Sequence, residues 1–293
     1  MKILLFARNG QLGWELQRTL APLGEVLALD FPEVDFTKPA SLKQVVRDSK
    51  PDLIINPAAY TAVDKAESEP EKAHLVNCVA VEVLANESKV LGIPLVHYST
   101  DFVFDGTKGT PYVEEDLPNP LSVYGRTKLE GDQAVLASGA PCIILRTSWV
   151  YSMRQGGFVT KVLSWARQQE TLRIVDDQVS GPTSARMLAE ATALMIAGGG
   201  SGLLAFFQQH VGLYNLAGSG ECSRYEWARE IIALDADKAQ QKVRQVLRAT
   251  SNEFPSPATR PAHSTLDCGK FEKTFGLKLP DWRLALKLMM ENG

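Results

Sequence analysis

The residues best suited to chemistry in this chain are Tyr124 and Lys128, within the segment 121–130. This segment is expected to begin a helix, and a spacing of four residues then places both side chains on one helical face, one turn apart. A phenol normally titrates near 10. An ammonium group about 4 Å from the phenolate, at an effective dielectric constant of about 20, favours ionisation by about 4 kcal/mol. That interaction corresponds to about 3 pKa units, which predicts a tyrosine that titrates near neutrality and acts as a general acid.

The same spacing also arises by chance, and two such residues then form an ordinary solvated helix face. The start of the chain favours the chemical interpretation. Apolar runs at 3–6 and 26–29 flank an amphipathic segment at 12–23, and Asp30 follows the second run. This order of strand, helix, strand and acid is typical of a unit that binds dinucleotides.

The turn that joins the first strand to the first helix carries Gly10 and Gly13. Glycines let the backbone approach a pyrophosphate, whose charge the N-terminus of the following helix stabilises. Ala7 stands where such turns usually have their first glycine, and its methyl group is tolerated there if its φ is negative. Taken alone, this turn would be an ordinary connection between a strand and a helix.

The alternation of strands and helices continues along the chain, so we predict an α/β fold with a doubly wound, Rossmann-type parallel sheet. Residues 1–150 are expected to form the dinucleotide-binding domain, with contributions from about 157–176 and parts of 210–225. Residues 151–293 are expected to form mostly a small C-terminal α/β substrate lobe. The further predicted strands are 52–55, 94–98, 142–145 and 172–175, and the further predicted helices are 41–49, opened by a capping box at Ser41, 71–91 and 158–168.

Composition limits the classes of partner. The net charge is −3 and no basic tract occurs, so no nucleic-acid partner is expected. The four cysteines and four histidines are scattered along the sequence, which favours reduced thiols and predicts no metal cluster. No apolar run approaches membrane-spanning length, and the first apolar run is too short for a signal peptide. We therefore expect a soluble cytoplasmic protein without a membrane partner.

The candidate chemical groups meet at one edge of the predicted sheet, because the carboxyl ends of parallel strands share that edge. Ala58 and Ala59 follow the third strand, and Ser99 and Thr100 follow the fourth. With Thr100 before Tyr124 and Lys128, the chain resembles the extended short-chain dehydrogenases/reductases, whose catalytic set is Ser or Thr followed by Tyr-x-x-x-Lys. Within them it resembles the dTDP-4-dehydrorhamnose reductases, and the segments that carry this resemblance are 56–67, 98–106, 146–151, 177–178, 182–183 and 260–264.

The resemblance implies reduction of the C4 ketone of dTDP-4-dehydro-L-rhamnose, with hydride from NADPH or NADH and a proton from Tyr124. It implies that Lys128 lowers the pKa of the tyrosine and binds the nicotinamide ribose, and that Thr100 donates a hydrogen bond to the developing oxyanion. The implied cofactor-binding positions are Arg8, Gly10, Gln11, Leu12, Gly13, Asp30, Asp35, Phe36, Ala58, Ala59, Tyr60, Ser99, Tyr124 and Lys128. The positions implied around the dTDP-sugar are Thr61, Val63, Thr100, Phe102, Trp149, Phe158 and Arg260.

The sequence departs from the family pattern at Ala7, at Pro57 where alanine is usual, and at Phe102 where relatives often carry a tyrosine near the sugar. Some family members also form a dimer bridged by a metal ion through acidic side chains. Glu15 fits one such position, but Arg186 stands where an acid is expected. We therefore expect a homodimer and no Mg²⁺ site.

Two other functions are compatible with this fold. The first is that of another nucleotide-sugar reductase or dehydratase. A 4,6-dehydratase would need a carboxylic acid directly after the Thr-Asp pair, where this chain has Phe102. A regulatory subunit of methionine adenosyltransferase shares the fold and binds a nicotinamide cofactor without using it. The intact set of Thr100, Tyr124 and Lys128 argues against that second function.

Cofactor choice depends on two residues of opposite effect. Asp30 suits a free ribose 2′-hydroxyl, which can donate a hydrogen bond to the carboxylate. Arg8 lies in the glycine turn, from which its guanidinium can reach a 2′-phosphate. The repulsion and the attraction should nearly cancel, so we expect dual use of NADH and NADPH with a modest preference for NADPH.

Overall fold

The centre of the molecule is one six-stranded parallel sheet with the strand order β10-β5-β4-β3-β1-β2. The computed structural model describes residues 1–154 and 156–291. The strand order, with helices on both faces, confirms the predicted doubly wound parallel sheet. Its strands are β1 (Lys2–Phe6), β2 (Glu25–Leu29), β3 (Leu53–Asn56), β4 (Leu95–Thr100), β5 (Cys142–Thr147) and β10 (Gly212–Asn215).

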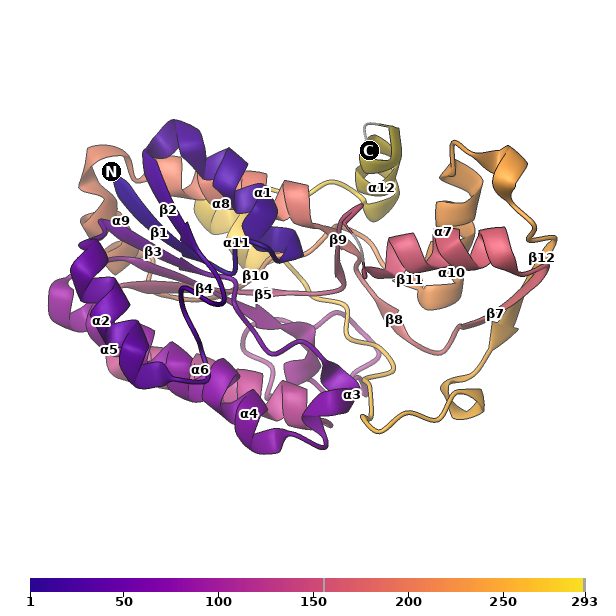
Figure 1. The fold of residues 1–293 in the computed structure, drawn as a ribbon, viewed down its shortest axis with the longest axis horizontal. Helices are drawn as coiled ribbons and strands as arrows, with labels where there is room; N and C mark the ends of the chain where they lie inside the picture. Colours follow the sequence, from indigo (N-terminus) through magenta and orange to yellow (C-terminus); the bar gives the residue numbers. More distant parts are fainter. Residues whose placement is uncertain (155, 292–293) are drawn as a thin grey trace.

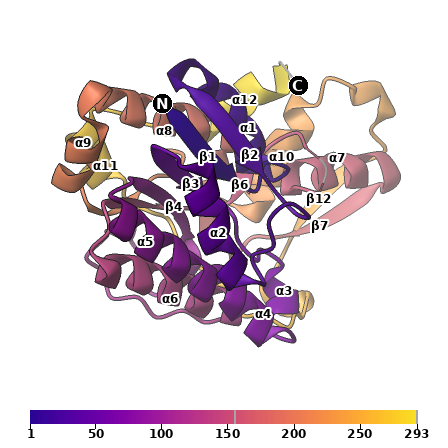
Figure 2. The same ribbon diagram turned by 60° about the vertical axis from the view of Figure 1, so that its left-hand side comes forward.

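Helices cover both faces of this sheet (Figures 1 and 2). Successive side chains of a strand point to opposite faces, so Ile3 and Leu5 enter one hydrophobic core while Leu4 and Phe6 enter the other. Because both faces are buried, β1 consists of consecutive apolar residues rather than alternating ones. One face is covered by α1 (Gln11–Leu20), α8 (Ala185–Gly198), α9 (Leu203–Gln209) and α11 (Gly269–Phe275), and the other by α2 (Pro39–Ser49), α5 (Ala80–Leu91) and α6 (Val123–Ser138).

The prediction that 172–175 is the sixth strand of the main sheet was wrong. This segment is β7 (Thr171–Val175), which pairs with β12 (Gln245–Ala249) in a separate two-stranded parallel sheet. The physical reason is that its burial alternates, with Thr171 and Arg173 exposed, whereas a strand inside a doubly covered sheet is buried on both faces. The sixth strand is instead β10, beside β5.

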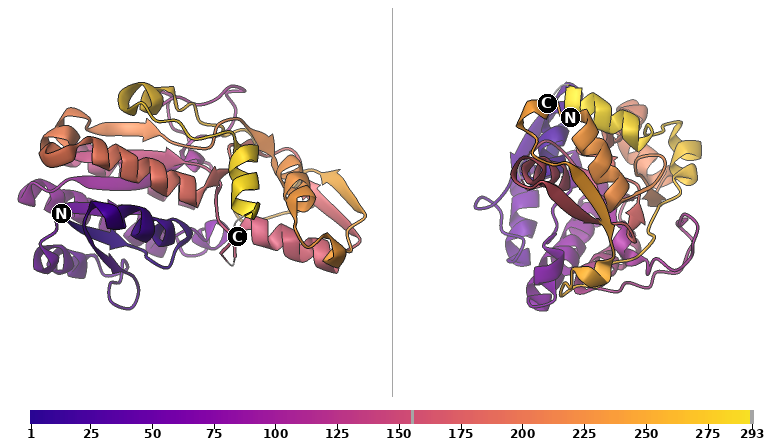
Figure 3. Two further views of the ribbon diagram at one scale, coloured as in Figure 1. Left: turned by 90° about the horizontal axis from the view of Figure 1, so that it is seen from above. Right: turned by 90° about the vertical axis from the view of Figure 1, so that its right-hand side faces the viewer.

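A second lobe therefore contains the segment 157–176, which was expected to contribute to the Rossmann domain. Its core joins α7 (Phe158–Gln168) and β7 to α10 (Arg224–Leu234) and α12 (Trp282–Glu291). α10 begins with a capping box, whose two members are Ser223 and Glu226. The left view of Figure 3 shows this lobe beyond one end of the main sheet. Two further two-stranded sheets are short. One pairs β8 (Val179–Ser180) with β11 (Cys222–Ser223), and the other pairs β6 (Val150–Tyr151) with β9 (Thr183–Ser184).

Two helix starts differ in detail from the prediction. α2 begins at Pro39, and Ser41 donates its hydroxyl to the Lys38 carbonyl instead of capping the helix. The helix predicted at 71–91 is α4 (Pro70–His74), a π-helical turn η2 (Leu75–Val79) and α5 in succession. A short helix, α3 (Val63–Ala66), precedes it.

Asn77 lies within the π-helical turn and ties it to its surroundings. Its side-chain oxygen accepts a hydrogen bond from the Tyr60 amide at 2.8 Å, and its amide nitrogen donates to Thr127 at 3.1 Å. α6 passes so close that a Cβ at Gly131 would lie 2.1 Å from the Asn77 carbonyl oxygen. Asn77 thus has a structural role between the loop after β3 and the helix that carries Tyr124.

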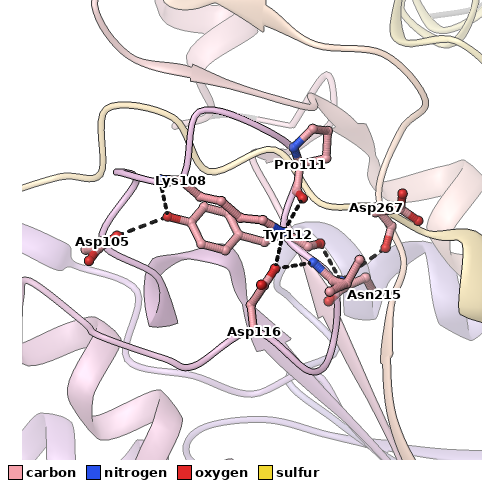
Figure 4. A network of polar contacts seen from close by, with 8 residues as sticks. Asp105, Lys108, Pro111, Tyr112, Asp116, Asn215 and Asp267 are labelled. Atoms are coloured by element: carbon pink, nitrogen blue, oxygen red, sulfur yellow. Dashed lines mark hydrogen bonds and ion pairs between the residues drawn. The ribbon is translucent and has the colours of Figure 1, made fainter.

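The loop after β4 is held against β10, the edge strand beside β5 (Figure 4). The Tyr112 hydroxyl donates to Asp105 at 3.0 Å. The Asn215 side chain, at the end of β10, donates to the carbonyls of Tyr112 and Asp267 at 2.9 and 3.1 Å. These contacts fix the path of the chain between β4 and α6.

No single helix among the described residues is long and apolar enough to cross a membrane, although the bent pair Ala185–Gly198 and Gly200–Gln209 together meets the same length and composition test.

Candidate active site

The turn between β1 and α1 has a conformation that is unusual for its sequence. Ala7 has a φ of +52°, so the negative φ that would accommodate its methyl group is not adopted. The Gly10 amide donates to the Ala7 carbonyl at 3.0 Å, and a Cβ at Gly13 would lie 2.0 Å from that same carbonyl oxygen. Gly13 is therefore required for close packing of α1 on the strand, and Ala7 holds a left-handed conformation that costs an L-residue about 1–2 kcal/mol.

The change Ala7→Gly is expected to raise the free energy of unfolding by about 0.5–1 kcal/mol, because the strain removed exceeds the extra freedom of glycine in the unfolded chain. Urea unfolding of both proteins measures the difference. Gly92→Ala is the matched control, since Gly92 also has a positive φ, of 64°, and its change should lower stability. A loss of stability in Ala7→Gly would contradict the strain.

The N-terminus of α1 offers free backbone amides to an anion. Its N-cap is Gly10, which has no side chain, and its first turn contains no acidic residue. The unsatisfied amides and the positive end of the helix dipole therefore remain available. The neighbouring carboxylate of Asp30 accepts hydrogen bonds from the amides of Asn9 and Phe31 at 2.9 and 2.8 Å, which fixes the outer side of the turn.

A cavity of about 820 Å³ lies at the carboxyl ends of the strands and contains much of the predicted site. A smaller cavity of about 240 Å³ lies beyond the ends of β1, β2 and β3. The predicted residues that line the large cavity are Gly10, Gln11, Leu12, Gly13, Ala59, Thr61, Ser99, Thr100, Tyr124, Lys128 and Trp149. Those that line the small cavity are Asp30, Asp35, Phe36, Ala58, Ala59 and Tyr60.

Five predicted residues line neither of these two cavities: Arg8, Val63, Phe102, Phe158 and Arg260. The Arg8 guanidinium donates to Glu33 at 2.7 Å and to the Ala28 carbonyl at 3.0 Å. Arg260 donates to Asp64 at 2.8 Å and to Ser256 at 2.7 Å.

Tyr124 and Thr100 lie next to each other at the carboxyl ends of the strands. Ser122 caps α6 by accepting from the Gly125 amide at 3.1 Å, so Tyr124 stands in the first turn. Phe102 packs edge-on against the Tyr124 ring, with centroids 5.7 Å apart. Burial raises the pKa of Tyr124 to about 12, and a hydrogen bond with Thr100 opposes this rise. The net direction of this shift is opposite to the lowering expected from Lys128.

Lys128 explains this difference, because its ammonium group has other partners. Its Nζ donates to the Tyr98 carbonyl at 2.7 Å and lies 3.3 Å from His97 Nε2. Burial lowers the pKa of Lys128 to about 8, and the nearby Asp132 opposes that shift. Asp132 itself accepts from Ser99 at 2.8 Å and from Arg146 at 3.2 Å, so the lysine lies in a buried polar network.

His97 was missed by the sequence analysis. It is fully buried in β4, and burial lowers its pKa well below the usual value, so its ring is neutral. Asn56 Oδ1 accepts from the Ala58 amide, which turns the Asn56 amino group towards His97 Nδ1 at 3.2 Å. The sequence signal for His97 was its position inside an apolar strand, one residue before Tyr98, because a buried histidine needs a polar partner.

Arg224 was also missed, because it comes from the second lobe. Its guanidinium carbon lies 3.5 Å from the centre of a Trp149 ring, and Trp149 has a strained φ of +41°. Burial lowers the pKa of Arg224 to about 9; Asp101 opposes the shift, and the nearby charge of Arg260 adds to it. With Phe158, Arg224 lines a further cavity of about 420 Å³. The Arg224 guanidinium thus lies beside two aromatic rings, those of Trp149 and Phe158.

Asp101 links the sheet to the segments of the second lobe. Its carboxylate accepts hydrogen bonds from Ser264 at 2.5 Å and from Ser180 at 3.3 Å, and Thr100 donates to it at 3.2 Å. All four residues are buried. Burial raises the pKa of Asp101 to about 6.

Possible metal ligands meet at one place away from the large cavity. His74, Cys78 and Glu130 offer ligand atoms within 4.8 Å of one another. Elsewhere, Glu15 lines a cavity of about 410 Å³ with Arg186 and Glu190, and Arg186 donates to Glu190 at 3.1 Å.

The family model described as RmlD substrate binding domain matches residues 1–293. The chain belongs to this family. A relative named dTDP-4-dehydrorhamnose reductase, from Escherichia coli (strain K12), is 41% identical over 297 residues, covering 99% of this chain and 97% of the relative.

Two solved structures resemble the molecule along its whole length. The dTDP-4-dehydrorhamnose reductase of Clostridium acetobutylicum has a TM-score of 0.90 at 35% identity, covering 99% of both chains. The dTDP-4-dehydrorhamnose reductase of Bacillus anthracis, solved in complex with NADP, has a TM-score of 0.88 at 31% identity and covers 100% of this chain and 99% of its own. Both lie within the family expected from the sequence.

Proposed function

We propose that this chain reduces the C4 ketone of dTDP-4-dehydro-L-rhamnose to the hydroxyl of dTDP-L-rhamnose, with NADPH or NADH as cofactor. The observation that carries the proposal is the cavity of about 820 Å³ in which Thr100, Tyr124, Lys128 and the glycine turn meet. Full-length similarity to relatives that bear the reductase name supports the substrate.

The glycine turn fits a dinucleotide cofactor. A pyrophosphate would lie against the uncapped N-terminus of α1, where Gly10 leaves the amides open. An adenosine group would extend towards the small cavity, which Asp30, Phe36 and Ala58 line. The similar structure from Bacillus anthracis was solved with NADP, which supports this assignment.

The chain supplies the proton and the orientation. When bound, the cofactor supplies the hydride that adds to C4. Tyr124 donates its phenolic proton to the C4 oxygen, and the hydroxyl of Thr100 donates a hydrogen bond to the same oxygen as charge develops. Lys128 binds the nicotinamide ribose and holds it beside Tyr124.

The second lobe provides the binding site for the nucleotide sugar. Trp149 stacks against the sugar, and the neighbouring guanidinium of Arg224 pairs with the diphosphate. Phe158, which lines the adjoining cavity with Arg224, packs against the base. Thr61, Val63, Phe102 and Arg260 complete the proposed binding site.

Turnover with dTDP-4-dehydro-L-rhamnose tests the function. The expected result is loss of reduced nicotinamide absorbance in step with formation of dTDP-L-rhamnose, identified by NMR. A protein that binds NADPH but reduces none of this substrate would contradict the proposal and favour a cofactor-binding subunit. Water loss from dTDP-glucose, measured in parallel, would instead indicate a dehydratase.

Arg8 and Glu33 are proposed to set the cofactor preference. The 2′-phosphate of NADPH would replace Glu33 as the partner of Arg8, so the ion pair between them competes with that phosphate. Arg8→Ala is expected to erase a modest preference for NADPH and leave NADH use nearly unchanged. Glu33→Gln is expected to increase the preference about threefold to tenfold, because a partly exposed charge-assisted contact is worth about 1 kcal/mol.

The ratio of kcat/KM for the two cofactors, in the parent and both variants, measures this effect. Glu25→Gln, which changes an exposed acid at the start of β2, is a suitable control. An equal loss of activity with both cofactors in Arg8→Ala would mean that Arg8 only shapes the turn.

We also propose that the protein is a cytoplasmic homodimer that binds neither nucleic acid nor membranes. Four free cysteines suit a reducing compartment. Sedimentation equilibrium measures the assembly state, and the addition of EDTA tests whether a metal ion contributes to it.

A further inference from the structure

We infer that Arg154 is a cofactor-binding residue, which holds the pyrophosphate of the dinucleotide from a position beside the N-terminus of α1. The inference rests on the proposed use of NADPH or NADH. Arg154 lies in the loop after β6, far from the glycine turn in sequence, and it lines the same cavity of about 820 Å³.

Three hydrogen bonds hold this loop to the glycine turn. Gln11 donates to the Val150 carbonyl at 3.3 Å and accepts from Ser152 at 3.0 Å. The Arg154 guanidinium donates to the carbonyl of Asn9 at 3.4 Å. The loop thus carries a cation directly to the residues that would surround a pyrophosphate.

The charges in the cavity favour this assignment. Lys128 and Arg154 are the cations among the described residues that line it, and Asp101 is the acid. The ammonium group of Lys128 already donates to the Tyr98 carbonyl, and it is the proposed partner of the nicotinamide ribose. A pyrophosphate is doubly anionic, and the amides at the start of α1 supply only partial positive charge. Among the described residues that line the cavity, Arg154 therefore supplies the full positive charge that can pair with the pyrophosphate.

Trp14 holds the guanidinium in place before any ligand binds. The guanidinium carbon of Arg154 lies 4.0 Å from the centre of the Trp14 ring, a cation–π contact. Trp14 belongs to α1 itself, so the helix that offers its N-terminus also positions the arginine. Such preorganisation reduces the entropy lost when the side chain engages an anion.

Arg18 provides a matched control for this contact. Its guanidinium carbon lies 3.8 Å from the same Trp14 ring, yet it is exposed and does not line the cavity. Replacing Arg18 removes an arginine from the same indole without removing a charge from the proposed pyrophosphate site.

The test is the dissociation constant of NADH and of NADPH, measured by the fluorescence of the reduced nicotinamide. Arg154→Ala is expected to weaken both about tenfold or more, because a hydrogen bond to a charged group contributes about 1.5–3 kcal/mol and 1.4 kcal/mol is tenfold. Arg18→Ala should remain within about twofold of the parent. Arg154→Lys, which retains the charge, should recover part of the loss.

Equal weakening of both cofactors distinguishes this role from recognition of the 2′-phosphate. Unchanged dissociation constants in Arg154→Ala, with the parent binding both cofactors, would overturn the inference. A loss confined to NADPH would overturn it as well. If the parent itself bound neither cofactor, the proposed function would fail instead, so the two failures are distinguishable.

Discussion

Replacing Tyr124 with phenylalanine is expected to lower kcat at least about 100-fold, because a positioned general acid contributes about 10²–10⁴ in rate. Affinity for NADPH and NADH should stay within about twofold of the parent, since only the phenolic hydroxyl is removed. Its ring packing against Phe102 would be retained. Single-turnover kinetics and cofactor fluorescence measure the two quantities separately.

Tyr214→Phe is the matched control for that substitution. The Tyr214 hydroxyl donates to the His210 carbonyl at 3.2 Å, and Tyr214 lines neither the large nor the small cavity. Its loss should change kcat little. Should Tyr124→Phe reduce substrate within a few-fold of the parent at neutral pH, Tyr124 is not the acid.

The pKa of Tyr124 sets the sign of its pH dependence. Burial raises the pKa to about 12, so the hydroxyl is protonated at neutral pH and ready to donate. A rate that needs this proton falls only as the pH rises through the pKa. A cofactor bound beside Tyr124 and Lys128 rearranges the same charges, and the high-pH limb of kcat reports the value in that complex.

Replacing Lys128 with methionine is expected to weaken nicotinamide binding and to lower turnover, because one ammonium group serves both the ribose and the neighbourhood of Tyr124. A loss of about tenfold or more in affinity follows from removal of a charged hydrogen-bond donor. Unchanged cofactor affinity would refute the shared role, and Lys89→Met, an exposed lysine in α5, is the control.

The same variant tests the buried charge through stability. Burial lowers the pKa of Lys128 to about 8 from 10.5, so between these values the unfolded chain binds more protons than the folded one. The free energy of unfolding contributed by this group therefore rises with pH from about 8 to 10.5. Urea unfolding at several pH values should show this rise in the parent and not in Lys128→Met.

The sequence predicted well those parts of the structure that depend on local patterns. Buried parallel strands consist of apolar runs, and their carboxyl ends fall at one edge, so Thr100, Tyr124 and the glycine turn could be expected to meet. The conformation of Ala7 could not be predicted, because its left-handed φ is imposed by the packing of α1 against β1.

Residues supplied by distant segments were the ones missed. Arg224 begins a helix of the second lobe and Arg154 follows a two-residue strand, so neither has a sequence spacing relative to Tyr124 that carries information. The wrong assignment of β7, in place of β10, as the sixth strand of the main sheet also has a physical cause. Both segments are short and apolar, and only Arg173 in β7 indicated a strand with one face open to solvent.

The carboxylate of Asp101 has a consequence for how the molecule comes apart. It is buried directly after Thr100, and it accepts hydrogen bonds from the hydroxyl groups of Ser180 and Ser264. If the segments holding these serines separated from the sheet, a buried carboxylate would lose its partners, at a cost that neither part can recover alone. The two parts should therefore melt in one cooperative transition, and a partly unfolded chain should not retain an ordered catalytic threonine.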